Sequence, residues 1–261
     1  MPLFKTSNPA LSGDTFSGSS SRYGGISSAQ YGGVTTGAMT LGGTINKTGI
    51  LLILTVLSAG FTWNQFAATH NPASVAPEVL VGFIGGFVFA LVTIFKKEWS
   101  PVTAPIYALL EGLGLGAISA LLDLRYPGIA IQAVGLTFAT LCVLLGLYST
   151  GVIRVTDKLR LGIVAATGGI FLFYVIEMVL GFFGIHFVAI NGSGPIGIAF
   201  SLFVVAIAAL NLVLDFDIIE QGVANGSPKY MEWYGAFGIL VTLVWLYLEM
   251  IRLLSKLRSR N

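Results

Sequence analysis

The chain contains 261 residues, of which 14 are Lys or Arg and 12 are Asp or Glu, so 10% are charged while 55% are hydrophobic. Soluble domains carry about 25% charged residues, and a soluble enzyme of this size would need more charge to cover its surface. A helix needs about 20 apolar residues to cross a bilayer. The composition therefore argues against a soluble protein and predicts an integral membrane protein in contact with the lipid bilayer.

Several functional classes lack the residues that they require. The single cysteine, Cys142, excludes an intrachain disulfide and a thiolate metal cluster. His70 and His186 are the only histidines and both flank apolar runs, which argues against a zinc hydrolase with three histidine ligands. The sequence also lacks a basic face with interleaved aromatic residues, the pattern that indicates nucleic-acid binding. We therefore expect neither an enzyme nor a nucleic-acid-binding protein, and no cofactor other than a bound cation.

The beginning of the chain differs in composition from the rest. Residues 1–46 are rich in Gly, Ser and Thr with scattered aromatic residues, and they lack the apolar core of a signal peptide. This composition predicts a flexible tail, with docking to a partner as the alternative interpretation. Residues 47–261 then form the transmembrane domain.

After residue 47, apolar runs alternate with short polar segments. The runs cover residues 48–68, 79–95, 102–122, 127–151, 161–184, 195–219 and 233–254. A membrane-spanning helix has about 20 residues, and each run is close to this length. We therefore predict an all-α polytopic protein with seven transmembrane helices. Glycines recur at helix-contact spacing, for example Gly82 with Gly86 and Gly112 with Gly116, and we expect them to serve close helix packing.

The positions of Lys and Arg predict a cytoplasmic N-terminus, since basic residues collect on the cytoplasmic side. Over the first six spans, the inner segments then hold Lys5, Arg22, Lys47, Lys96, Lys97, Arg154, Lys158, Arg160 and Lys229. The outer loops hold only Arg125. Lys256, Arg258 and Arg260 follow the last run and lie outside if the last helix crosses fully. The sequence leaves open whether they are an exception or whether a late segment is re-entrant.

Five of the 12 acidic residues lie inside the apolar runs, where an ionised carboxylate costs several kcal/mol. They are Glu111, Glu177, Asp215, Asp217 and Glu249. Such groups must pair with a cation, bind a metal ion or take up a proton. We therefore treat them as candidate functional residues.

Helical geometry separates the two aspartates. Asp215 and Asp217 are two residues apart, so they lie on opposite faces of a helix. Steps of three and four residues back from Asp215 meet a small and polar stripe formed by Asn211, Ala208 and Ser201. Asp217 continues an apolar stripe. We expect Asp215 to face the bundle, and Asp217 to reach the inner interface as an ordinary solvated acid.

The other three acids have different surroundings. Glu249 shares a stripe with Thr242, and Arg252 is placed three residues further along for a local ion pair that would only anchor the helix end. Glu111 lies mid-span in a Gly-rich helix, either as part of a cation or proton site or as a neutral acid bonded to a neighbouring helix. Glu177 lies among aromatic residues, where we expect a supporting or protonated structural role.

The acids form a staggered series across the predicted bilayer. With a rise of about 1.5 Å per residue, Asp215 lies about five residues from the inner end of its span, Glu111 about ten and Glu249 about 16. Asp215 and Glu249 are then about 16 Å apart, unless the sixth helix continues well past Glu220. This spacing favours stepwise passage of protons or cations, and since oxygen ligands suit Ca²⁺, we expect Asp215 and Glu249 to contact calcium.

Four segments carry a resemblance to a known family: 211–220 (NLVLDFDIIE), 228–238 (PKYMEWYGAFG), 246–249 (LYLE) and 105–116 (PIYALLEGLGLG). Together they resemble the Bax inhibitor-1 family, in particular its bacterial YccA-like branch. The resemblance implies a seven-helix fold with the last helix near the bundle centre, in a bacterial inner (plasma) membrane.

The resemblance also implies a function, a pH-sensitive calcium leak governed by facing acids in the last two helices. In some relatives an arginine of the second helix holds these acids, whereas residues 79–95 contain no arginine. The predicted site comprises Asp215, Glu249 and Glu111, supported by Asn211, Glu177 and Arg252. The alternative function is a non-conducting modulator of a membrane-bound AAA protease or another membrane partner, with the tail as its contact.

Overall fold

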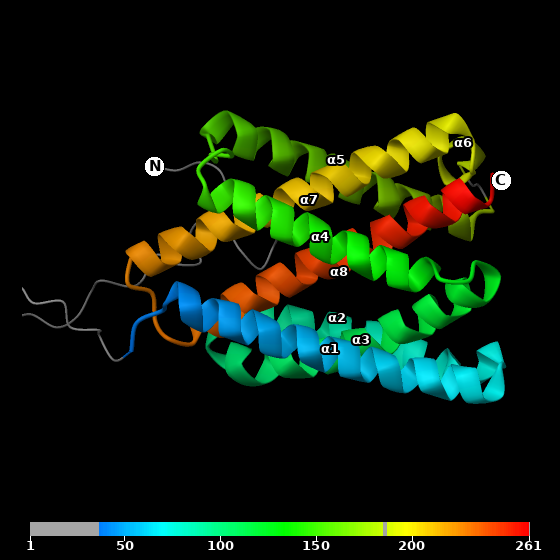
Figure 1. The fold of residues 1–261 in the computed structure, drawn as a ribbon, viewed down its shortest axis with the longest axis horizontal. Coiled ribbons are helices and arrows are strands. Elements are labelled where there is room, and N and C mark those ends of the chain that lie inside the picture. Colours follow the sequence, from blue (N-terminus) through cyan, green and yellow to red (C-terminus); the bar gives the residue numbers. More distant parts are fainter. Residues whose placement is uncertain (1–36, 185–186, 261) are drawn as a thin grey trace, which may run out of the picture.

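The computed structural model describes residues 37–184 and 187–260, and over these ranges the chain is a bundle of helices joined by short turns (Figure 1). The long helices are α1 (Leu41–Thr69), α2 (Ala76–Phe95), α3 (Ser100–Arg125), α4 (Ile129–Ser149), α5 (Asp157–Phe182), α7 (Pro195–Ala224) and α8 (Met231–Arg258). The short helical turns between them are η2 (Pro72–Val75), η3 (Lys97–Trp99) and α6 (Val188–Asn191). No strand occurs in the described ranges.

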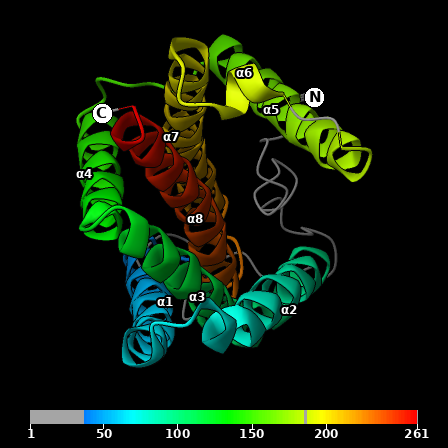
Figure 2. The same ribbon diagram turned by 90° about the vertical axis from the view of Figure 1, so that its right-hand side faces the viewer.

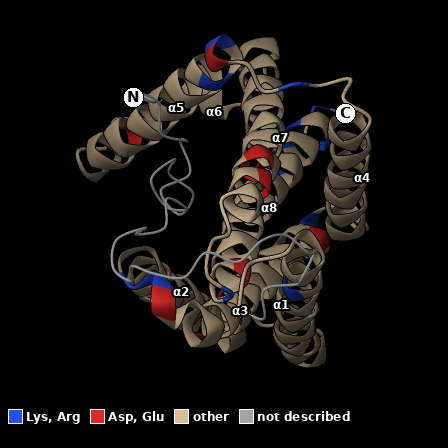
Figure 3. Ribbon diagram, turned by 90° about the vertical axis from the view of Figure 1, so that its left-hand side faces the viewer, with Lys and Arg blue, Asp and Glu red and all other residues tan. Residues whose placement is uncertain are grey.

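Within the described ranges, seven helices are long and apolar enough to cross a membrane, which confirms the predicted all-α architecture and the number of spans. Figure 3 shows how few charged positions these helices carry. Several helices are longer than the apolar runs that predicted them. A helix of 30 residues such as α7 measures about 45 Å, against about 30 Å for the hydrocarbon core, so its ends reach the polar interface.

The first helix begins earlier than the composition predicted. Thr40 caps α1 with its side chain, and the helix starts one residue later. Just before this cap, the backbone N–H of Met39 donates to Ser227 O at 2.7 Å, and the Met39 side chain is buried. Residues 41–46, which we expected in the flexible tail, are therefore helical, and 37–40 pack against the turn between α7 and α8. The rest of the predicted tail lies outside the described residues.

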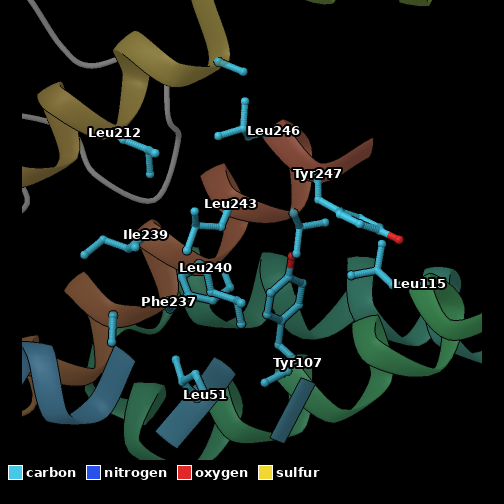
Figure 4. Packing of buried hydrophobic residues seen from close by; sticks show 14 of the residues in the cluster. Leu51, Tyr107, Leu115, Leu212, Phe237, Ile239, Leu240, Leu243, Leu246 and Tyr247 are labelled. Carbon is cyan, nitrogen blue, oxygen red and sulfur yellow. The ribbon is translucent and has the colours of Figure 1, made fainter. Parts of the chain in front are cut away.

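The last helix, α8, lies at the centre of the bundle (Figure 2). It contacts α1, α3, α4 and α7, and 19 of its 28 residues are buried, whereas only Ile163 and Ile170 are buried in α5. Leu240 of α8, Leu51 of α1 and Tyr107 of α3 belong to the main hydrophobic cluster (Figure 4). This position confirms the prediction for the last helix.

α3 approaches α1 and α2 closely at positions without side chains. A Cβ atom placed on Gly82 of α2 would lie 2.6 Å from Gly114 N and 2.8 Å from Leu110 O. A Cβ atom on Gly116 would lie 2.7 Å from the Cα of Ala59 in α1. Ordinary contacts between carbon atoms begin at about 3.5 Å. Glycine is therefore required for this packing, which confirms the expected role of the small residues.

The bundle has two ends, which we name the Lys47 end and the Arg258 end. α1 and α8 both begin at the Lys47 end, and the chain reaches its C-terminus at the opposite end (Figure 1). α7 and α8 are each uninterrupted, so the described residues contain no re-entrant late segment. Lys256 and Arg258 therefore lie at the end opposite to Lys47, as an exception to the distribution of basic residues in the first six spans.

Candidate functional site

Asp215 lies between α7 and α8 and is completely buried. The hydroxyl of Thr242 on α8 donates a hydrogen bond to Asp215 Oδ2 at 2.5 Å. One turn earlier on α7, Asn211 is also buried, and its side-chain amide donates to Thr167 Oγ1 of α5 at 2.8 Å. The structure therefore places Asp215 and Asn211 inside the bundle, on the face that the polar stripe predicted.

α7 and α8 run antiparallel and meet along faces with a seven-residue spacing, which we call the α7–α8 seam. Two hydrogen bonds define its register: Thr242 with Asp215, and Lys256 with Ser201. On each helix the two bonded residues are 14 positions apart, so one register holds across both contacts. Midway between them it places Glu249 opposite Ala208, and both are buried. The seam thus carries a polar group about every two turns.

Glu249 lies seven residues after Thr242 on the same face of α8 and is 3% exposed. Its Oε1 atom accepts hydrogen bonds from the Tyr174 hydroxyl of α5 at 2.9 Å and from Arg252 Nη1 at 3.0 Å. Arg252 also donates to the Tyr174 hydroxyl at 2.6 Å. The local ion pair that the sequence placed here is formed, and Tyr174 connects it to α5.

Asp217 faces the opposite side of α7, as the two-residue spacing predicted. Its Oδ2 atom accepts from Arg160 Nη2 of α5 at 2.5 Å and from Gln221 Nε2 at 2.6 Å. The expectation of an ordinary solvated acid is therefore wrong. Because α5 packs on α7, Arg160 in the first turn of α5 reaches Asp217 and neutralises it.

Glu111 and Glu177 lie apart from the seam. Glu111 is 7% exposed on α3, and its carboxylate faces α2, where a Cβ atom on Gly86 would lie 2.6 Å from Oε2. Glu177 of α5 is partly buried and accepts a hydrogen bond from the side-chain amide of Asn191 in α6. Among the described residues, neither acid forms a hydrogen bond with Asp215 or Glu249.

Asp215 and Glu249 occupy separate positions along the seam. Thr242, the partner of Asp215, is seven residues from Glu249, or about 10.5 Å along α8. This is less than the sequence predicted, because α7 continues to Ala224 and places Asp215 nine residues from its end. Calcium ligands lie within about 2.6 Å of the ion, so a calcium site shared by both carboxylates is not formed. The described residues contain no group of three or more His, Cys, Asp or Glu side chains suited to a metal.

A cavity of about 470 Å³ lies between α5, α7 and α8. It is lined beside Asp215 by Asn211 and Thr242, and beside Glu249 by Tyr174. Thr167 contributes a further hydroxyl, and the remaining lining residues are glycine or apolar. Hydroxyl and amide groups therefore line one cavity next to both carboxylates, within a wall that is otherwise apolar.

Comparison with family models decides the relationship of the chain. Residues 8–259 match the model of the family described as Bax inhibitor 1 like. The chain belongs to this family. No curated protein and no solved structure matches this Bax inhibitor 1 like protein.

In this Bax inhibitor 1 like protein, Glu249 of the last helix pairs with an arginine of the same helix. α2 contains no arginine, as the sequence indicated. Arg252 takes the position next to Glu249 instead, one turn further along α8. The protein therefore neutralises Glu249 within α8, and the second helix does not contribute to this pair.

Sequence reasoning missed Lys256 of the Bax inhibitor 1 like protein, which it counted only as a basic residue after the last run. The Lys256 side chain is 6% exposed. Its Nζ atom donates to Ile190 O at 2.8 Å, to Gly197 O at 3.1 Å and to Ser201 Oγ at 2.9 Å. Thr242, Glu249 and Lys256 are each seven residues apart, and this spacing would have placed Lys256 on the same buried face of α8.

Glu232, in the first turn of α8, was also missed. Its side chain is completely buried and accepts hydrogen bonds from Thr40 N at 2.9 Å, from Lys229 Nζ at 2.7 Å and from Lys47 Nζ. One carboxylate therefore joins the start of α1, the α7–α8 turn and α8. Only Lys229, three residues before Glu232, offered a signal in the sequence, since the other two partners are far away along the chain.

Proposed function

We propose that this Bax inhibitor 1 like protein is a pH-sensitive cation leak of the membrane, in which Asp215 and Glu249 are successive carboxylate positions along the α7–α8 seam. The observation that carries this proposal is the cavity between α5, α7 and α8, which borders the hydrogen-bond partners of both carboxylates. Calcium and protons are the proposed cations, because carboxylate oxygens bind both.

The charge state of the two carboxylates makes the proposed leak depend on pH. A carboxylate attracts a cation only while it is ionised, so protons and metal ions compete for the same group. At Glu249 a further competitor is Arg252, whose guanidinium already holds the carboxylate. A passing cation must displace this contact. The apolar part of the cavity wall resists hydration, as hydrophobic constrictions do in channels, and this suits a slow leak.

Flux measurements with purified protein in calcium-loaded proteoliposomes test the proposal. The wild-type protein is expected to leak at different rates at about pH 6 and about pH 8, the range in which a buried acid changes protonation. The Asp215→Asn variant removes the charge but keeps the size of the side chain. We expect its flux to be about tenfold lower than that of the wild type, a factor that corresponds to about 1.4 kcal/mol. We also expect its flux to be the same at both pH values.

The matched control is Asp217→Asn, which makes the same change on the opposite face of α7, where Arg160 is the partner. We expect this variant to keep the pH difference. Glu249→Gln and Glu111→Gln then measure the share of the two other acids, with the larger loss expected at Glu249. A leak in Asp215→Asn equal to that of the wild type at both pH values would refute the mechanism.

A further inference from the structure

A second cavity, of about 330 Å³, lies at the Arg258 end, between the ends of α3 and α8 and the segment that joins α6 to α7. Its polar lining includes Arg125, Asn191, Ser193, Arg252, Lys256 and Ser259. No Asp or Glu is among its lining residues. The charged side chains in the wall are therefore all cationic.

The charge of this wall is only partly neutralised. Glu249 pairs with Arg252 from outside the cavity. Lys256 directs its Nζ atom to two backbone carbonyls and one hydroxyl, and no carboxylate among the described residues pairs with it. Arg125 is exposed and likewise pairs with no acid in the described part of the chain. Arg125 and Lys256 thus form no ion pair within the described residues, although Glu249 and Glu177 act electrostatically on Lys256 from nearby. The three cations of the wall, Arg125, Arg252 and Lys256, outnumber these two acids.

The buried position of Lys256 makes this imbalance energetically significant. Lys256 is 6% exposed as a residue, so its ammonium group has lost part of its hydration, and neutral acceptors replace only some of it. A bound anion would neutralise the positive charge that remains. The expected orientation of the protein also favours an anion at this cavity. The basic residues of the first six spans predict that the Arg258 end faces away from the cytoplasm. Clustered cations are unusual on that side.

We propose that this cavity binds a phosphate-type oxyanion, with the Arg125 guanidinium as the direct ligand and Lys256 as a fixed positive charge behind it. Guanidinium matches the oxygens of a phosphoryl group with two parallel hydrogen bonds. Asn191 and Ser193 also line this wall, where the Asn191 amide already donates to Glu177 and the Ser193 hydroxyl is bonded to that of Ser259. The volume lies in the range of small-ligand pockets, about 300–1,000 Å³. This proposal is independent of the cation leak.

Two sources supply such a group, the headgroup of an anionic phospholipid and free phosphate, and binding experiments on the full-length protein distinguish them. In nanodiscs of phosphatidylcholine, inorganic phosphate is titrated by equilibrium dialysis, and dihexanoyl phosphatidylglycerol by native mass spectrometry with dihexanoyl phosphatidylcholine as the neutral reference. Arg125→Gln is expected to weaken binding about tenfold, the effect of one hydrogen bond between charged groups. Arg125→Lys should recover part of the loss.

The control is Arg154→Gln, which removes one exposed arginine at the Lys47 end and is expected to leave binding unchanged. Saturable binding of phosphatidylglycerol alone identifies a lipid headgroup as the ligand, binding of phosphate alone identifies a soluble anion, and binding of both supports a general phosphoryl site. The proposal is overturned if neither probe binds, or if Arg125→Gln and Arg154→Gln change the affinity equally.

Discussion

The contact between α2 and α3 allows a quantitative test of the packing. In Gly82→Ala, the new Cβ atom would lie 2.6 Å from the backbone nitrogen of Gly114, about 1 Å inside an ordinary contact distance of about 3.5 Å. Backbone cannot rotate away as a side chain can, so the two helices must separate. Overpacking of this kind typically costs about 1–3 kcal/mol.

Gly135→Ala is the matched control, because the same substitution in the interior of α4 meets no atom within 4 Å. Both variants gain the higher helix propensity of alanine, so this gain cancels in their difference. Gly82→Ala should therefore be less stable than Gly135→Ala by about 1–3 kcal/mol. The ratio of folded to unfolded protein then differs by about fivefold to 150-fold. Unfolding of both variants by sodium dodecyl sulfate in mixed micelles, followed by tryptophan fluorescence, measures it. Equal stabilities would show that α2 and α3 do not pack as closely as the structure indicates.

Two further predictions concern the Lys47 end. Glu232→Ala should lower the free energy of unfolding by about 1–3 kcal/mol, because it leaves the partly buried donors of Thr40 and Lys47 without their acceptor. The same detergent titration should show a much smaller change for the exposed Glu98→Ala, and a similar change would contradict this role. Deletion of residues 2–40 removes the Thr40 cap, the buried Met39 side chain and the hydrogen bonds from Thr40 to Glu232, and it should lower stability by about 2–4 kcal/mol more than deletion of residues 2–36. If the tail is the contact with a membrane-bound protease, the shorter deletion also abolishes co-purification with that protease, and unchanged co-purification would count against that alternative function.

The number and order of the spans were predictable from local composition. Whether a stretch of about 20 residues enters the membrane depends on the summed transfer free energy of its own side chains, and no knowledge of its neighbours is needed. Helix ends were less predictable. α1 begins at Leu41 because Thr40 is held by Glu232, a residue 192 positions away in the sequence.

The orientation of Asp215 was predictable for a similar reason. Helical periodicity alone places it on the stripe of Asn211 and opposite to Asp217, and the buried and ion-paired environments of the two aspartates agree with that separation. Their partners were not predictable. Thr242 meets Asp215 only because α7 and α8 adopt one particular register, and Arg160 meets Asp217 only because α5 packs on α7.

The low content of charged residues, 26 in 261, by itself determined the class of protein, the spans and the few acidic residues that lie inside them. Burial and helical periodicity are properties of short segments, so they can be read without a partner. Only the tertiary structure decided which charges meet. It connected the Glu249–Arg252 pair to Tyr174 of α5, separated Glu249 from Asp215, and buried Lys256 beside a cationic cavity. Contacts of this kind depend on which helices are neighbours and in what register they pack, and neither is encoded within a single span.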